Sequence, residues 1–100
     1  MSSDKLSSAK LSSESVRLDI WLWRARFFKT RNLSARLIAK GKVRITRGPQ
    51  VFRVRKPHSE VHIGDQLTFM AYDKLTRIEV LDIGERRGSA PEAQSLYSHI

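Results

Sequence analysis

The chain has 100 residues and a mass of 11.5 kDa, the length of one domain, which excludes a multidomain enzyme. Nineteen Lys and Arg residues against ten Asp and Glu give a net charge of +9 and a pI of about 10.7, as in nucleic-acid-binding domains. The absence of cysteine excludes disulfides, thiolate zinc sites and thiol catalysis. Because no apolar run of about 18 residues and no signal-peptide core is present, we expect a cytoplasmic protein without stable membrane association.

The positive charge is concentrated in the middle of the chain. Residues 16–60 contain thirteen Lys and Arg against two acidic residues, a net charge of +11, whereas residues 1–15 are neutral and residues 61–100 carry −2. A merely solvated surface normally mixes both signs, so this stretch indicates a surface for a polyanion.

The first elements in chain order are a polar tail and two helices. Residues 1–15 contain seven serines and few apolar groups, too little burial to offset the entropy of ordering, so we expect a flexible tail. Helical spacing predicts a first helix over about 17–26 and a second over about 31–40, with Thr30 as its N-cap and Gly41 as its left-handed C-terminal residue. The predicted buried stripes are Leu18, Trp21, Leu22 and Ala25 in the first helix and Leu33, Leu37 and Ile38 in the second.

After Gly41 the apolar pattern changes to the two-residue period of strands. Short strands are expected at about 43–45, 51–55, 67–71 and 77–81, with turns at Gly48-Pro49, Pro57 and Gly64-Asp65. In the second of these strands Arg53 and Arg55 share one face, and Phe52 and Val54 share the other.

A short helix is predicted at the end of the chain. Ser89 and Glu92 form a capping box. The apolar face of this helix would consist of Ala93, Leu96, Tyr97 and Ile100. The predicted fold class is α+β, with two N-terminal helices packed on a small, mostly antiparallel sheet. The tail covers 1–15, the main domain 16–88, and a short C-terminal helix packed on or beside the domain covers 89–100.

The sequence contains no pattern typical of catalysis or metal binding. Gly41-Lys42 lacks the upstream glycine and the following Ser or Thr of a phosphate-binding loop, and no serine stands in a nucleophile elbow. His58 and His62 are four residues apart, but the flanking proline and glycine argue against a helix that would place both on one face. We therefore predict a protein that is not an enzyme and has no catalytic residue, metal or cofactor.

The segment from Arg17 to Arg31 combines both tryptophans, two phenylalanines and five cations. Cations hold phosphates and planar side chains stack on exposed bases, a mixture typical of RNA-binding surfaces. Trp21 lies on the apolar stripe and is best explained as core, whereas Trp23 and Ile20 lie off it and need another partner, in the sheet or the terminal helix. The same composition also fits a membrane-surface helix, which is one alternative function.

The second helix carries a basic flank. Arg36 and Lys40 are one turn apart outside the apolar stripe, and Lys42 and Arg44 continue the charge into the first strand. A basic flank that runs into a basic strand indicates a surface that follows phosphates, and the same charges would also attract DNA.

Several motifs within residues 16–100 together resemble a known family. They are Arg17-Leu-Asp with Trp21-Leu-Trp, Ala25-Arg-Phe-Phe-Lys-Thr-Arg31, Gly41-Lys-Val43, Lys56-Pro57, Val61 with Gly64-Asp65 and Leu67-Thr68, Arg86-Arg87-Gly88, and Glu92-Ala93 with Leu96-Tyr97. This string is similar to the ribosome-associated heat-shock proteins of bacteria, small stand-alone members of the RNA-binding domain superfamily named after ribosomal protein S4.

The resemblance implies an αL-type fold in which the two helices and the first strand form the RNA face. It also implies binding to the free large ribosomal subunit that still holds a nascent chain on tRNA after stalled translation. The protein would act there in rescue or recycling during stress, with ribosomal RNA and the peptidyl-tRNA as ligands. The expected RNA-binding residues are Arg17, Arg24, Lys29, Arg31, Arg36, Lys40, Lys42, Arg44 and Lys56. We expect a monomer. A second alternative is a targeting subunit for a separate RNA-modifying enzyme.

Three features depart from the family pattern. Ile20 stands where the family usually has a lysine, which removes one phosphate contact. The segment 43–56 is longer than usual and has Ile45-Thr-Arg-Gly48 where an Asn-Gly hairpin is expected. The sequence ends at Ile100 without the long basic extension of many relatives.

Overall fold

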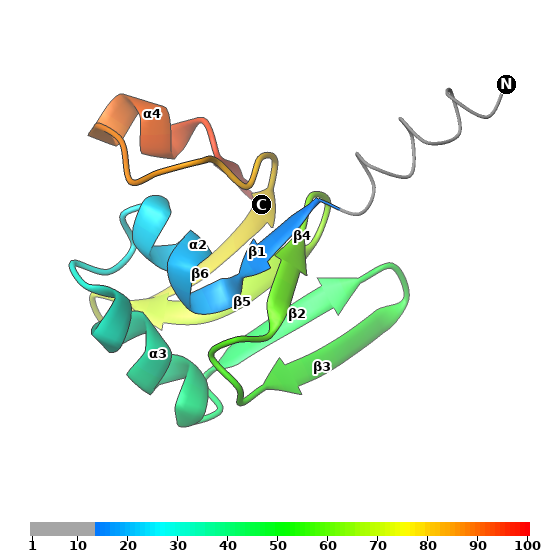
Figure 1. The fold of residues 1–100 in the computed structure, drawn as a ribbon. Helices are drawn as coiled ribbons and strands as arrows, with labels where there is room; N and C mark the ends of the chain where they lie inside the picture. Colours follow the sequence, from blue (N-terminus) through cyan, green and yellow to red (C-terminus); the bar gives the residue numbers. More distant parts are fainter. Residues whose placement is uncertain (1–13) are drawn as a thin grey trace, which may run out of the picture.

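A computed structural model describes residues 14–100 (Figure 1). Its helices are α2 (Leu18–Arg24), α3 (Arg31–Ala39) and α4 (Ala90–Gln94). Its strands are β1 (Ser15–Arg17), β2 (Val43–Arg47), β3 (Gln50–Val54), β4 (Glu60–His62), β5 (Gln66–Ala71), β6 (Lys74–Val80) and β7 (Tyr97–His99). Helices thus combine with antiparallel strands, which confirms the predicted α+β class. Within the described residues no helix is long and apolar enough to cross a membrane.

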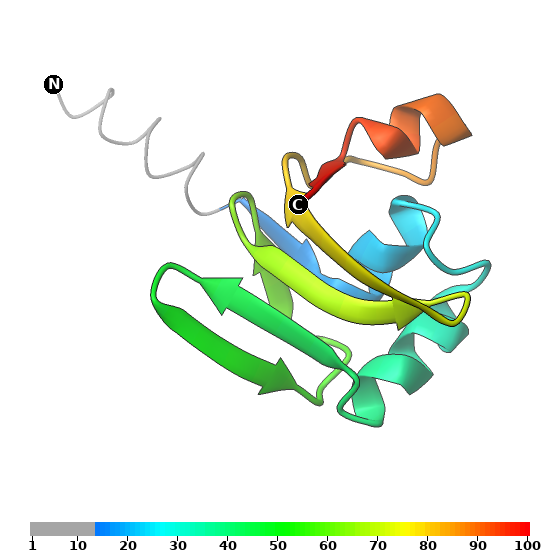
Figure 2. The ribbon, with the colours of Figure 1, turned by 180° about the vertical axis from the view of Figure 1, so that it is seen from behind.

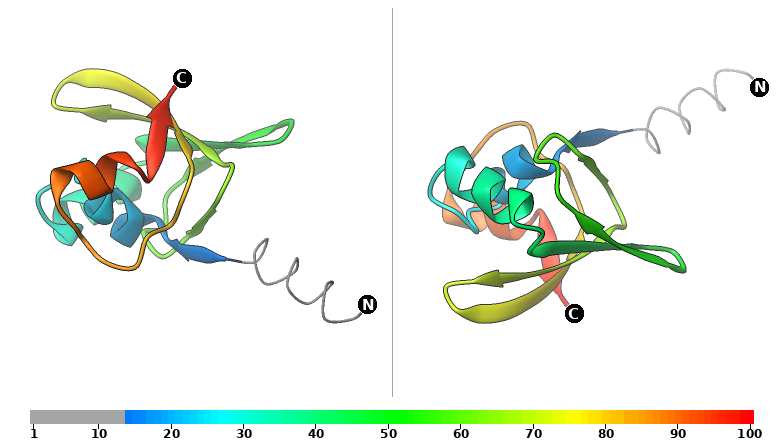
Figure 3. Two further views of the ribbon diagram at one scale, coloured as in Figure 1. Left: turned by 90° about the horizontal axis from the view of Figure 1, so that it is seen from above. Right: turned by 90° about the horizontal axis from the view of Figure 1, so that it is seen from below.

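The main layer is a five-stranded antiparallel sheet in the order β3-β2-β5-β6-β7. Helices α2 and α3 lie on one side of this sheet, and the view from behind shows the strands in front of them (Figures 1 and 2). Strands β1 and β4 form a separate two-stranded sheet (Figure 1). The views from above and below show α4 next to α2, on the side where the C-terminal strand returns to the sheet (Figure 3).

The core fills the space between the helices and the sheet. Side chains alternate between the two faces of a strand, so every second residue of β2, β5 and β6 points inward. The inward, buried side chains of these strands include Val43, Ile45, Leu67, Phe69, Ile78 and Val80. They are covered by Trp21 and Leu22 of α2 and by Ile38 of α3, which belong to the same buried cluster.

Trp21 lies in the core, as predicted. Its side chain is 0 % exposed, and the indole Nε1 donates a hydrogen bond of 2.8 Å to the carbonyl of Asp82. The ring also lies 6.3 Å from that of Phe27, measured between centroids. Trp21 therefore joins the first helix to the segment that follows β6.

Strand β1 corrects the predicted start of the first helix. Val16 pairs with Val61 of β4, so residues 15–17 form a strand and α2 begins at Leu18. The helix ends at Arg24, two residues earlier than predicted, and Arg26 has a left-handed φ of +63°, outside the helical region. Residues 1–13 of the predicted tail lie outside the described residues.

Helix α3 has the predicted caps but a different buried face. The Thr30 hydroxyl accepts a hydrogen bond of 3.1 Å from the Leu33 N–H, and Gly41 has a φ of +73° after the last turn. Leu33 itself is 45 % exposed, so its prediction as core is wrong. Ser34 is buried instead of Leu33. The Ser34 hydroxyl donates a hydrogen bond of 2.8 Å to the Asp19 carbonyl, so this face of α3 packs against α2.

Replacing Thr30 by alanine should destabilise the protein by about 1 kcal/mol, since the first turn of α3 loses its side-chain acceptor. Urea denaturation followed by circular dichroism measures this change. Thr30→Ser keeps the hydroxyl and should retain most of the stability. Equal stability of both variants would show that the cap contributes little.

The β2–β3 hairpin has a two-residue turn. Arg47 pairs with Gln50, which leaves Gly48 and Pro49 as the turn residues, and Gly48 has the φ of +58° that such turns require at their first position. Gly48-Pro49 therefore forms the two-residue turn between β2 and β3, at the place where an Asn-Gly turn is expected in the family.

The predicted terminal helix is only half correct. The Ser89 cap is present, with its hydroxyl 3.4 Å from the Glu92 N–H, but the helix ends at Gln94. Residues 97–99 form β7 instead and pair with the edge of β6, whose backbone groups would otherwise lack a partner. Tyr97 packs its ring 4.6 Å from that of Phe27, measured between centroids. The division of the chain at residue 88 stays a prediction.

Candidate nucleic-acid interface

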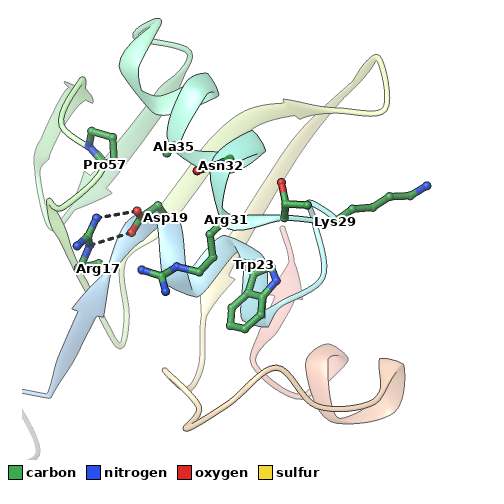
Figure 4. Close-up of a pocket in the computed structure, with 9 residues that line it drawn as sticks. Arg17, Asp19, Trp23, Lys29, Arg31, Asn32, Ala35 and Pro57 are labelled. Atoms are coloured by element: carbon green, nitrogen blue, oxygen red, sulfur yellow. Dashed lines mark hydrogen bonds and ion pairs between the residues drawn. The ribbon is translucent and has the colours of Figure 1, made fainter.

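An open hollow lies where β1, α2 and α3 meet, and we call it the helix hollow (Figure 4). Its volume is about 630 Å³. Its lining residues are Arg17, Asp19, Trp23, Lys29, Thr30, Arg31, Asn32, Ala35 and Pro57. Three of the nine predicted RNA-binding residues, namely Arg17, Lys29 and Arg31, therefore lie around one hollow.

Arg17 is held in place by a buried carboxylate. Its Nε and Nη2 donate to the two carboxylate oxygens of Asp19 at 3.1 and 2.9 Å, and Asp19 is only 4 % exposed (Figure 4). Asp19 also accepts a hydrogen bond of 2.8 Å from the Ile20 N–H. Two parallel hydrogen bonds fix the guanidinium plane, so Arg17 is oriented at the rim while its charge is largely balanced.

Lys29 and Arg31 carry the net positive charge of the hollow. Both are exposed, and neither has an ion-pair partner within residues 14–100. Lys29 lies in the loop before α3, and Arg31 begins the helix directly after the Thr30 cap. The Ser34 hydroxyl donates to the Asp19 carbonyl at 2.8 Å, which joins α3, with Arg31 at its start, to α2.

Trp23 forms one wall of the helix hollow. The guanidinium carbon of Arg87 lies 5.8 Å from the centroid of its ring, and the Arg87 Nε donates to the Trp23 carbonyl at 3.1 Å. The partner of this off-stripe tryptophan is thus a side chain of the segment before α4, not the sheet or the terminal helix as predicted. A half-buried indole that lines the same hollow as two unbalanced cations has the chemistry to stack on a nucleic-acid base.

Other predicted residues surround a second hollow, at the end of α3 and on the sheet. Lys40, Lys42 and Arg44 line it together with Arg53 of β3. The side chains of Arg53 and Arg55 lie close to the backbone of Gly41: a Cβ there would lie 3.0 Å from Nη1 of Arg55 and 3.2 Å from Cδ of Arg53. Sequence reasoning did not count Arg53 and Arg55 among the RNA-binding residues, although their shared strand face was a usable signal.

The last three predicted residues have different surroundings. Arg24 donates from Nη1 to the carbonyls of Ile83 and Gly84, at 3.2 and 2.9 Å, so it fastens α2 to the segment after β6. Arg36 is exposed on α3, one turn before Lys40. Lys56 is exposed in the loop that leads to Pro57 at the helix hollow.

Arg47 and His62 both lie beside the buried carboxylate of Asp65. Arg47 donates from Nε and Nη2 to the buried Asp65 at 2.8 and 2.7 Å, and these hydrogen bonds raise the pKa of Arg47. His62 lies beside the same carboxylate, with its Nδ1 3.9 Å from Oδ2. Within residues 14–100 no three His, Asp or Glu side chains come together as metal ligands.

The chain is similar to known proteins both in the segment of the helix hollow and over most of its length. Residues 16–45, which contain the helices and cations of the helix hollow, match the family model of the S4 domain. The chain is 37 % identical to the heat shock protein 15 homolog of Haemophilus influenzae, over 87 % of this chain and 63 % of that protein. It is 40 % identical to heat shock protein 15 of Escherichia coli K12, over 82 % of this chain and 58 % of that protein. The chain thus spans about three fifths of the length of these relatives.

A solved structure is also similar. The trimeric structure of heat shock protein 15 from Vibrio cholerae matches 87 % of this chain and 83 % of its own, with a TM-score of 0.74 and 40 % sequence identity. The match of residues 16–45 to the S4-domain model assigns α2 and α3, with the basic hollow at the start of α3, to an S4 domain. The sequence identity over most of the chain is more specific: the chain belongs to the heat shock protein 15 family. This confirms the resemblance found in the motifs.

Proposed function

We propose that the protein is a non-catalytic RNA-binding protein of the cytoplasm that binds ribosomal RNA of the free large ribosomal subunit. The subunit would carry a stalled nascent chain on tRNA, and the protein would act in its rescue or recycling during stress. The observation that carries this proposal is the helix hollow, which Lys29, Arg31 and Trp23 line together within the S4-domain segment.

The chemistry of the helix hollow favours RNA as the ligand. Unbalanced cations bind phosphates and release condensed counterions, which gives affinity without sequence preference. The indole of Trp23 offers a face for an unpaired base. The Nε and Nη2 of Arg17 donate to Asp19, which leaves its Nη1 at the rim to donate to a phosphate. These groups bind and orient a ligand. The carboxylate in the lining, Asp19, is engaged by Arg17, which favours binding over proton transfer.

The membrane-surface alternative is less well supported. An interfacial helix needs an exposed apolar face. In α2 the apolar side chains Leu18, Trp21 and Leu22 are each 0 % exposed, and the following Phe27 is 9 % exposed, so the core uses most of the apolar surface of this segment. Ile20 and Trp23 are half-buried.

The proposal is tested by sedimentation of the tagged protein in cell lysate through a sucrose gradient, with and without a translation stall, at low and high salt. Co-migration with free large subunits that increases on stalling and decreases with salt is the expected result. A protein that stays at the top of the gradient at low salt would contradict ribosome binding. Liposome flotation of the same preparation then tests the membrane alternative.

The oligomeric state is measured in the same preparation. The monomer stays a prediction, and the trimer described for the Vibrio cholerae relative is the alternative. Sedimentation velocity of the purified protein, alone and with RNA, separates the two.

A further inference from the structure

Three arginines stand in one row on the outer face of the five-stranded sheet. Arg53 of β3 lies opposite Arg44 of β2, Arg44 lies opposite Thr68 of β5, and Thr68 lies opposite Arg77 of β6. Directly opposite residues of antiparallel strands point to the same face. Neighbouring strands are about 4.8 Å apart, so this sheet row crosses four strands and roughly 14 Å.

The sheet row is not neutralised by the protein. None of its three arginines forms an ion pair within residues 14–100. The four strands contain one acidic residue, Glu79, and it makes no ion pair there either. Like charges directly opposite each other on a sheet are destabilising, so the pair of Arg44 and Arg53 costs stability in the free protein.

The surroundings of the row extend its positive charge and add apolar contacts. Lys40 and Lys42 border the hollow that Arg44 and Arg53 line, as do the half-exposed Met70 and the exposed Leu75. Figure 2 shows the side of the sheet that α2 and α3 do not cover. Ile45, Leu67 and Ile78 are buried on the helix side, so the row, formed by the residues next to them in the strands, points to the opposite side. The row and the helix hollow therefore face different directions.

We infer that the outer face of the sheet is a second RNA-binding surface, on which Arg53, Arg44 and Arg77 bind successive phosphates of a backbone segment other than the one in the helix hollow. The ligand follows from charge complementarity, because a line of unbalanced guanidinium groups fits a line of phosphates. The inference rests on the proposed RNA binding and extends it: one small domain would hold two RNA segments on two faces.

The test uses two double variants of equal charge. The row variant carries both Arg53→Gln and Arg77→Gln, and the control variant carries both Lys74→Gln and Arg86→Gln. Lys74 pairs with inward-facing Ala71, and Arg86 pairs with Glu92 near α4, so neither belongs to the row. Binding of the full chain to a labelled fragment of ribosomal RNA is measured over a series of salt concentrations. The row variant should reduce the slope of log affinity against log salt by about 1.4–1.8, which corresponds to two lost phosphate contacts.

The control variant should have a salt slope close to that of the wild type. The row variant should have a melting temperature at low salt that is equal to or above that of the wild type. Higher stability with weaker RNA binding is the signature of a ligand-binding row, since arginines that merely stabilised the sheet would lower the melting temperature when removed. A row variant that binds RNA as the control does overturns this inference and leaves an acidic protein surface as the ligand to test. A wild type without salt-dependent RNA binding overturns the proposed function as well.

Discussion

Replacing Lys29 and Arg31 together by glutamine should lower the affinity for ribosomal RNA by about a hundredfold at low salt. Each cation lost from the helix hollow removes one charge-assisted contact, worth about 1.5 kcal/mol or roughly tenfold in affinity. The slope of log affinity against log salt should also become flatter, by about 0.7–0.9 for each lost contact. Both quantities are measured by fluorescence anisotropy with labelled RNA over a series of salt concentrations.

Arg17 stays unchanged in this variant, because its removal would leave the buried carboxylate of Asp19 without its cation. The variant Lys74→Gln with Arg86→Gln removes the same charge elsewhere and serves as the control. We expect its affinity to change little. If both variants lose affinity equally, binding depends on net charge alone, and the helix hollow is not the site.

Replacing Trp21 by alanine should destabilise the protein by about 3–5 kcal/mol, the range for large core aromatics. The change leaves a cavity between α2 and the sheet. It also removes the indole N–H that donates a hydrogen bond to the Asp82 carbonyl. Since small domains are stable by only about 5–15 kcal/mol, a large fraction of the total is lost. Chemical denaturation followed by circular dichroism gives the difference directly.

Trp23→Ala is the matched comparison for Trp21→Ala. Trp23 is half-buried at the rim of the helix hollow, so we expect a much smaller loss of stability and a clear loss of RNA affinity. The two tryptophans lie in one helical turn, yet one should affect mainly stability and the other mainly binding. A stable Trp21→Ala variant, or a Trp23→Ala variant with unchanged RNA binding, would contradict these roles.

Most of the fold could be predicted because local patterns and tertiary packing agree along most of the chain. Thr30 and Gly41 mark the two ends of α3, and the alternation of Leu67 and Phe69 marks the inner face of β5. The errors lie where a long-range pairing outweighs a local pattern. Tyr97 has helical spacing relative to Ala93, but residues 97–99 pair with the open edge of β6 instead. Three residues at 15–17 are likewise too few to show a strand pattern without their partner β4.

The candidate site was predicted only as a set of charges. The sequence places thirteen cations within residues 16–60 but does not divide them between surfaces. The structure divides them: Lys29 and Arg31 line the helix hollow, Arg24 holds the chain after β6, and Arg47 is paired with Asp65. The partners of Arg47 and Arg24 lie 18 and 60 positions away in the sequence. A local sequence pattern therefore cannot show that these two cations are engaged.

By itself, the sequence determined the fold class, the family, the capped second helix and the excess of positive charge, because these depend on composition, short-range spacing and motif identity. Only the tertiary structure decided which cations remain unbalanced and which face each one occupies. Strand register is the physical reason, since it places Arg44 between Arg53 and Thr68 on the outer face of the sheet and keeps Ile45 in the core. A shift of that register by one residue would exchange the two faces.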